Sequence, residues 1–292
     1  MNYTRYFLPI LLLSLVACKQ QSAPADAYGN FEAIEVMVSS EFGGRIISFL
    51  PEEGEELVKD QMSVTIDTTQ LYLKKIQLES GKASLSSRIK TLDAQIRANR
   101  VQMDNLEREK LRIDNLVEGG AATTKQQDDI NGQMALLEAQ IQATESQKAS
   151  VYAERKTLEV QIKQAEDQLM KCAIRNPITG ILLTKYKEAG EMTAPGQALY
   201  KVANLDELIL RAYVSGNQLS SVAIGKEVRV RFDVEEGLEE IAGKVSWVSP
   251  RAEFTPKIIQ TKEERVNLVY ALKIQVVNPG SLKIGMPGEV LF

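Results

Sequence analysis

The sequence FGGRII at residues 42–47, followed by EEGE at residues 52–55, returns in a related form 136 residues later. There, ITGILL occupies residues 178–183 and EAGE occupies residues 188–191. Five identical pairs align without a gap at this offset: Gly44/Gly180, Glu52/Glu188, Gly54/Gly190, Glu55/Glu191 and Gln61/Gln197. Two of these pairs are glycines, flanked by apolar pairs that suit strands. We therefore expect two halves of one small β-domain, with turns at Gly44, Gly54, Gly180 and Gly190.

Residues 71–172, between the two halves, carry a heptad pattern. The first seam repeats every seven residues: Leu78, Leu85, Leu92, Asn99, Leu106 and Ile113. The second seam steps by three and four residues over most of its length: Ile130, Met134, Leu137, Ile141, Val151, Leu158, Ile162, Ala165 and Leu169. Such a narrow apolar stripe is typical of an antiparallel coiled-coil hairpin, with arms of roughly 70 Å at 1.5 Å per residue. A compact helical bundle is the alternative, although two arms supply no further layer to cover a wide apolar face.

The link between the two arms has residues suited to a tight turn. Gly119 and Gly120 can take positive φ and permit the turn. Thr123 or Thr124 can cap the returning helix, with Gln126 or Gln127 three residues later as its partner in a capping box. A well-made turn does not explain why Arg112, Leu116 and Thr123 line up at spacings of four and seven residues.

The first 18 residues are typical of a targeting segment. Arg5 precedes an apolar run at residues 7–16, and the run ends in the sequence LVAC at residues 15–18. This ending resembles a bacterial lipobox, in which Cys18 would receive diacylglycerol and become the mature N-terminus. An ordinary signal peptide with a chance cysteine, or a short uncleaved anchor, is the alternative. The polar residues 19–30 are predicted to form a flexible tether.

Composition excludes several classes of function. The chain has 292 residues and a net charge of −4, so no overall positive field favours nucleic acid. It has no histidine, which removes the commonest general base and the commonest transition-metal ligand. There is no Gly-x-Ser-x-Gly sequence, no Walker lysine loop and no cysteine pair for a metal. We therefore expect no enzyme activity, no cofactor and no metal site.

The split β-domain, the hairpin and the lipobox together resemble the HlyD family of periplasmic adaptors, also called membrane fusion proteins. The resemblance implies an α+β fold in which a coiled-coil α-hairpin (residues 71–172) is inserted into a split lipoyl/biotinyl-like β-domain (residues 31–70 and 173–206). A small β-barrel would follow at residues 207–292. In the family the hairpin tip carries an arginine, a leucine and a serine that engage an outer-membrane duct. Arg112 and Leu116 match this pattern, and Thr123 replaces the serine.

The C-terminal third is predicted to hold five strands, near residues 208–214, 227–232, 241–248, 268–277 and 289–292, with a helix at 215–223. The polar run at residues 250–267 is too long for an ordinary turn, so we expect a contact loop, with a plain surface excursion as the alternative. Its sequence AEFTPK at residues 252–257, followed by EER at residues 263–265, resembles the adaptors of ABC-type exporters. The resemblance implies a transporter-contact loop with Phe254, Thr255, Pro256 and Arg265. Many adaptors continue into a membrane-proximal domain, which is expected to be absent because the sequence stops at Phe292.

The resemblance also implies the partners. These are an inner-membrane transporter (ABC-type favoured, a proton-driven pump left open), an outer-membrane duct and further copies of the chain, six in the family. Lipoyl carriers hold their cofactor on a lysine at a tight turn, where this chain has the hairpin instead. The expected location is the periplasm, with Cys18 anchoring the chain to the inner membrane. A structural lipoprotein that acts as a coiled-coil spacer, with no role in transport, remains the alternative.

Overall fold

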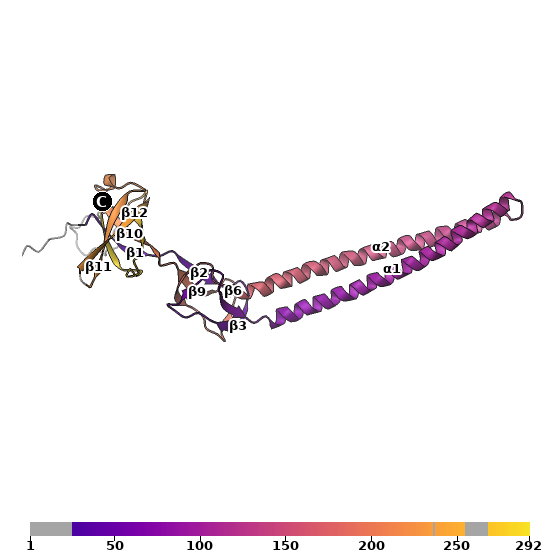
Figure 1. Ribbon diagram of the computed structural model, residues 1–292, viewed down its shortest axis with the longest axis horizontal. Helices are drawn as coiled ribbons and strands as arrows, with labels where there is room; N and C mark the ends of the chain where they lie inside the picture. The colour runs from indigo at the N-terminus through magenta and orange to yellow at the C-terminus, as the bar shows by residue number, and fades with distance from the viewer. Residues whose placement is uncertain (1–24, 236, 255–267) are drawn as a thin grey trace, which may run out of the picture.

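The computed structural model describes residues 25–235, 237–254 and 268–292. Three parts lie in a row (Figure 1): a β-barrel at one end, a small β-sandwich in the middle and a long helical hairpin at the other end. The barrel and the hairpin therefore project from opposite ends of the sandwich. Among the described residues, no helix combines the length and the apolar character needed to cross a membrane.

The hairpin consists of α1 (Thr69–Glu118) and α2 (Thr124–Lys171), with 50 and 48 residues. The two helices are antiparallel and run side by side to the tip (Figure 1). The predicted seams face inward, and the most buried apolar side chains along the two helices are Ile89, Leu92, Ile96, Ile130, Leu137, Val151, Ile162 and Ala165. The two long helices are confirmed, and no third layer covers them among the described residues, so the compact bundle is not formed.

Ion pairs across the hairpin fix the register of its arms. Lys75 Nζ lies 2.9 Å from Glu166 Oε1, and Lys82 Nζ lies 3.3 Å from Glu159 Oε1. The step of seven residues from Lys75 to Lys82 along α1 thus matches the step of seven residues from Glu166 back to Glu159 along α2. Lys148, further toward the tip, is paired with Asp93. Lys82 and Lys148 lie at positions that interrupt the apolar seam, and each pairs with a carboxylate of the other arm.

The sandwich consists of eight short strands: β2 (Glu35–Ser39), β3 (Gly44–Phe49), β4 (Glu56–Leu57), β5 (Met62–Ile66), β6 (Ala173–Arg175), β7 (Gly180–Lys185), β8 (Met192–Thr193) and β9 (Ala198–Ala203). They form two sheets with the orders β2-β9-β7-β4 and β6-β5-β3-β8. Each strand of the first half has an equivalent about 136 residues later: β6, β7, β8 and β9 correspond in order to β2, β3, β4 and β5. The two sheets therefore have the same order, and each contains strands from both halves of the repeat.

The hairpin leaves the sandwich between two strands that pair with each other. β5 ends shortly before α1, β6 begins shortly after α2, and Val64 of β5 lies opposite Ile174 of β6. The core beneath holds fully buried Ile46, Leu57, Ile66, Leu182 and Tyr200. Because α1 starts and α2 ends at paired strands over one core, the sandwich fixes the direction of the hairpin.

The barrel contains β1 (Ala27–Glu32), β10 (Glu207–Ser215), β11 (Glu227–Val234), β12 (Gly237–Val248), β14 (Leu268–Val277) and β15 (Pro287–Leu291). Their order is β10-β1-β15-β11-β12-β14, and the pairing of β10 with β14 closes the sheet. The short strand β13 (Glu253–Phe254) pairs with the outer part of β14. Phe31 and Phe232 meet edge to face in the core, with their ring centres 6.3 Å apart.

Two sequence expectations for this region are wrong. The tether predicted at residues 19–30 is wrong for residues 27–30, which belong to β1, a strand of the barrel whose Ala27 and Phe31 are buried on its inner face. The helix predicted at residues 215–223 is only a single turn of 3₁₀-helix at Leu219–Ser221. Helical propensity is low there because Gly216 follows the predicted cap directly and is unfavourable in a helix.

Candidate functional site

The turn at the hairpin tip is held by backbone hydrogen bonds. Ala121 N and Ala122 N both donate to Leu116 O, at 2.7 and 3.2 Å. Gly120 has a φ of 73°, as the reversal requires. Gly119 instead ends α1 with a helical φ of −77°, so only Gly120 uses the positive φ that both glycines allow. One left-handed residue is sufficient to end the helix and start the turn.

Thr123, one of the two predicted caps, is the N-cap of the returning helix α2. Thr123 N donates to Gln126 Oε1 at 3.0 Å, which is the contact of a capping-box glutamine. Gln127 Nε2 donates to Asp114 Oδ1 of the other arm at 2.8 Å. The tip is therefore a fixed end of the hairpin with both arms tied together.

Arg112, Leu116 and Thr123 all lie exposed near this end of the hairpin. Leu116 is 41% exposed, and Arg112 forms an ion pair with Glu109 of its own helix. Leu111 is 65% exposed close by, and the sequence pattern did not single it out. The outer surface near the tip therefore presents two exposed leucines and the cationic side chain of Arg112.

The four repeat-related glycines of the sandwich fall into two kinds. Gly54 and Gly190 are turn residues with φ values of 86° and 95°. Gly44 and Gly180 are the first residues of β3 and β7, so the turns predicted at these two positions are wrong. They are required by close packing: a Cβ on Gly180 would lie 2.3 Å from Ala203 O, and one on Gly44 would lie 2.7 Å from Ile66 Cγ2.

The junction of α2 and β6 has no feature of a cofactor-carrying turn. Lys171 ends the helix, and a hydrogen bond to the Asp167 carboxylate raises the pKa of its ammonium group. Cys172 is fully buried, and burial raises the pKa of its thiol. Cys172 is thus enclosed by the protein, whereas Lys171 is an exposed side chain at the end of a helix rather than on a loop. Among the described residues, no three His, Cys, Asp or Glu side chains are grouped so as to hold a metal ion.

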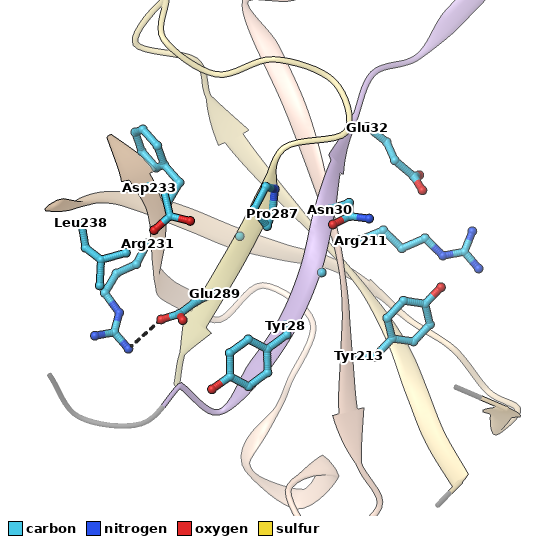
Figure 2. A pocket seen from close by; sticks show the side chains of 13 residues that line it. Tyr28, Asn30, Glu32, Arg211, Tyr213, Arg231, Asp233, Leu238, Pro287 and Glu289 are labelled. Atoms are coloured by element: carbon cyan, nitrogen blue, oxygen red, sulfur yellow. Dashed lines mark ion pairs between the residues drawn. The ribbon is translucent and has the colours of Figure 1, made fainter. Parts of the chain in front are cut away.

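A hollow of about 530 Å³ lies on the outer face of the barrel, over β11, β15, β1 and β10 (Figure 2). Tyr28, Asn30 and Pro287 lie along its middle. Arg231 Nη2 is paired with Glu289 Oε2 at 3.2 Å on one side. On the other side Arg211 Nη2 is paired with Glu253 Oε2 of β13 at 3.2 Å. The hollow is thus lined by tyrosines and ion pairs, and it lies beside β13.

Some predicted site residues cannot be placed. Phe254 belongs to β13, and its backbone lies opposite Leu268. Thr255, Pro256, Arg265 and the lipidation candidate Cys18 lie outside the described residues. The contact loop predicted at residues 250–267 is therefore described only where it leaves the barrel, beside the hollow.

No family model matches the chain. It is 25% identical to a protein of Yersinia enterocolitica described as a "UPF0194 membrane protein", in an alignment that covers 100% of this chain and 99% of that protein. It is also 23% identical to a "UPF0194 membrane protein" of Acidithiobacillus ferridurans, over 90% of this chain and 85% of that protein.

Solved structures with the same fold carry more specific names. MacA from Actinobacillus actinomycetemcomitans is 21% identical, with a TM-score of 0.59, in an alignment that covers 90% of this chain and 76% of MacA. The periplasmic adaptor protein EmrA is 17% identical with a TM-score of 0.52, over 91% of this chain and 97% of EmrA. The membrane fusion protein Spr0693 from Streptococcus pneumoniae R6 has a TM-score of 0.51 at 17% identity, over 90% of this chain and 96% of Spr0693. The chain therefore has the fold of the periplasmic adaptors, or membrane fusion proteins.

Proposed function

We propose that the chain is the periplasmic adaptor subunit of a tripartite export system, which links an inner-membrane transporter to an outer-membrane duct for the passage of small molecules. The observation that carries the proposal is the placement of the barrel and the hairpin tip at opposite ends of one extended molecule (Figure 1). A long rigid arm with an exposed Leu116 at its end suits contact with a distant partner. The fold shared with periplasmic adaptors supports the same function.

In this proposal each part has its own role. The sandwich of strands β2 to β9 is a split lipoyl-like domain that serves as a base for the hairpin of α1 and α2. Arg112, Leu116 and Thr123 contact the duct. The barrel, residues 207–292 with β1 added from the N-terminus, faces the transporter, and the segment that leaves β13 contributes Phe254, Thr255, Pro256 and Arg265. An ABC-type exporter is the favoured transporter.

The proposed setting is the periplasmic face of the inner membrane, with Cys18 carrying the lipid anchor. Several copies, six by resemblance to the family, would surround a conduit, because a single hairpin cannot enclose one. The chain itself would perform no chemistry, so the energy for transport would come from the transporter.

The test is deletion of the gene, followed by measurement of the export of a panel of dyes and antibiotics and by purification of the tagged chain from membranes. Export of some panel members should fall, and the chain should co-purify with a transporter and a duct protein. Restoration by the wild-type gene, but not by Cys18→Ala, would support the anchor. Unchanged export together with an altered spacing of the two membranes would contradict the proposal and favour a spacer.

A further inference from the structure

One end of the barrel lies away from the sandwich and the hairpin (Figure 1). β1 leads from the barrel into β2 of the sandwich, so its first residue, Ala27, lies at this far end. β10 starts beside the sandwich and ends here at Ser215, which lies opposite Val269 of β14. We call residues 215–226 the rim loop, and we call this end of the barrel the distal rim: Asp26, the rim loop, Leu268 and Phe292.

The rim loop is held firmly but leaves an aliphatic side chain in solvent. It has no charged residue before Lys226, its last residue. Leu219 and Val222 pack from the loop against the barrel core, and Lys226 Nζ donates to Ser221 O at 2.8 Å. Ile224 points away from this core and is 69% exposed. Its exposure therefore belongs to a fixed loop and does not contribute to the packing of the barrel.

Two further apolar side chains of the distal rim are accessible. Leu268 is 53% exposed at the start of β14, and Phe292, after β15, is partly exposed. Lys226 Nζ lies 5.7 Å from the centre of the Phe292 ring. The carboxylate of Asp26 accepts the N–H of Phe292, and Glu227 follows the rim loop. Exposed apolar side chains beside a lysine suit the boundary between lipid headgroups and acyl chains.

The proposed lipid anchor brings this rim close to a membrane. Eight residues along the chain separate Cys18 from Asp26 of the distal rim. Even when fully extended, a stretch of that length spans at most about 29 Å. A short connection keeps the rim at a high effective concentration near the lipid headgroups. A weak apolar contact is therefore enough to hold the rim there.

The inner-membrane transporter is the other candidate to cover the distal rim. Protein interfaces are enriched in tyrosine, tryptophan, arginine and methionine. The rim loop contains none of these four residue types. The hollow on the outer face of the barrel does contain them, since Tyr28, Tyr213 and Arg211 line it. The composition thus favours a protein partner for the hollow and a lipid surface for the rim.

We propose that the distal rim rests on the lipid surface, with Ile224 at the level of the headgroups and the upper acyl chains. The inference deepens the proposed function and rests on the anchor at Cys18. A single lipid anchor leaves a long molecule free to tilt about its attachment point. A second contact, at the end of the barrel, removes that freedom and directs the hairpin, at the opposite end, away from the membrane (Figure 1).

The test places the environment-sensitive dye NBD on Ala223→Cys, beside the intact Ile224. The full chain is purified with its anchor and reconstituted into vesicles of phosphatidylethanolamine and phosphatidylglycerol. The native Cys172 is buried and should not react with the dye. On vesicles the emission should shift to the blue, and lipid with a doxyl group on its acyl chain should quench it.

Two variants provide the controls. Ile224→Asp in the same chain should abolish the blue shift, because a carboxylate is unfavourable in lipid, and should leave Tm unchanged, because the side chain is exposed. NBD on Val277→Cys should report water throughout. Val277 is 73% exposed at the other end of β14, opposite Glu207, where the barrel joins the sandwich.

Flotation of the vesicles separates the anchor from the rim contact. If the chain does not float with the vesicles, the anchor fails and the inference fails with it. If the chain floats but the dye at Ala223→Cys stays in water, the anchor stands and the rim contact is wrong. A blue shift that survives Ile224→Asp, or that requires the co-purified transporter in the vesicles, would also overturn the inference.

Discussion

Gly54 and Gly190 occupy equivalent places in the two halves of the sandwich, and each ties its half to the other. Gly54 N donates to Leu182 O at 2.8 Å, and Gly190 N donates to Ile46 O at 2.8 Å. Leu182 follows Ile46 by the same 136 residues that separate the glycines. The repeat in the sequence is therefore a repeat in the hydrogen bonds, and the two halves complete each other around the base of the hairpin.

Alanine at either turn glycine should destabilise the sandwich by a similar amount. Both glycines have positive φ, and no atom lies within 4 Å of the added Cβ at either position, so the cost is conformational. We expect Gly54→Ala and Gly190→Ala each to lower the free energy of unfolding by about 1–2 kcal/mol, measured by urea denaturation. Gly132→Ala, in the exposed interior of α2, is the matched control and should stabilise by about 1 kcal/mol. A loss at only one of the turns would contradict the equivalence.

The strand glycines should differ from the turn glycines and from each other. At Gly180 the added Cβ would meet the backbone oxygen of Ala203, which cannot move without shifting β9. Gly180→Ala should therefore cost about 2–3 kcal/mol in the same assay. The Cβ added by Gly44→Ala would meet a methyl group of Ile66, which can shift, so the loss of unfolding free energy should be smaller. Equal losses would show that the neighbouring atoms do not decide the cost.

The hairpin should lose stability in acid through Glu159. Hydrogen bonds from Lys82 and then Lys156 lower the pKa of this carboxyl group. Because the folded-state pKa is below the unfolded one, the stabilisation is present above the ordinary glutamate pKa. It is lost as the pH falls through the lower folded value. In melts followed by circular dichroism, Glu159→Gln should lower Tm at neutral pH, and the difference from wild type should vanish in acid.

The control for this experiment is Glu154→Gln. Glu154 is exposed on the same helix and has no ion pair among the described residues. Its Tm should match that of the wild type at every pH. A difference between wild type and Glu159→Gln that persists in acid would show that packing, rather than charge, explains the effect of Glu159.

Local pattern was enough to predict the parts of the fold with strong periodicity. The seam through Leu85 and Leu92 predicted α1 almost to its ends, and the strand predicted at residues 268–277 has the bounds observed for β14. Heptads and alternating apolar residues report burial directly, so long elements are recognisable from the sequence alone.

Features set by distant partners could not be predicted. β1 has only two apolar side chains larger than glycine on its inner face, Ala27 and Phe31, and its place in the barrel depends on β10 and β15, which lie far along the chain. Gly44 and Gly180 looked like turn glycines because the sequence shows a glycine but not the atom that its missing Cβ would strike.

The most direct test of the proposed function is export by tip variants, with Leu111 as the matched control. Arg112→Asp and Leu116→Asp should reduce export to the level of the gene deletion, because the exposed contact for the duct is lost. Thermal unfolding should be unchanged, since both side chains are exposed. Leu111→Asp makes the same change at a more exposed leucine and should retain export. Normal export in both Arg112→Asp and Leu116→Asp, or an equal loss in Leu111→Asp, would contradict docking through these tip residues.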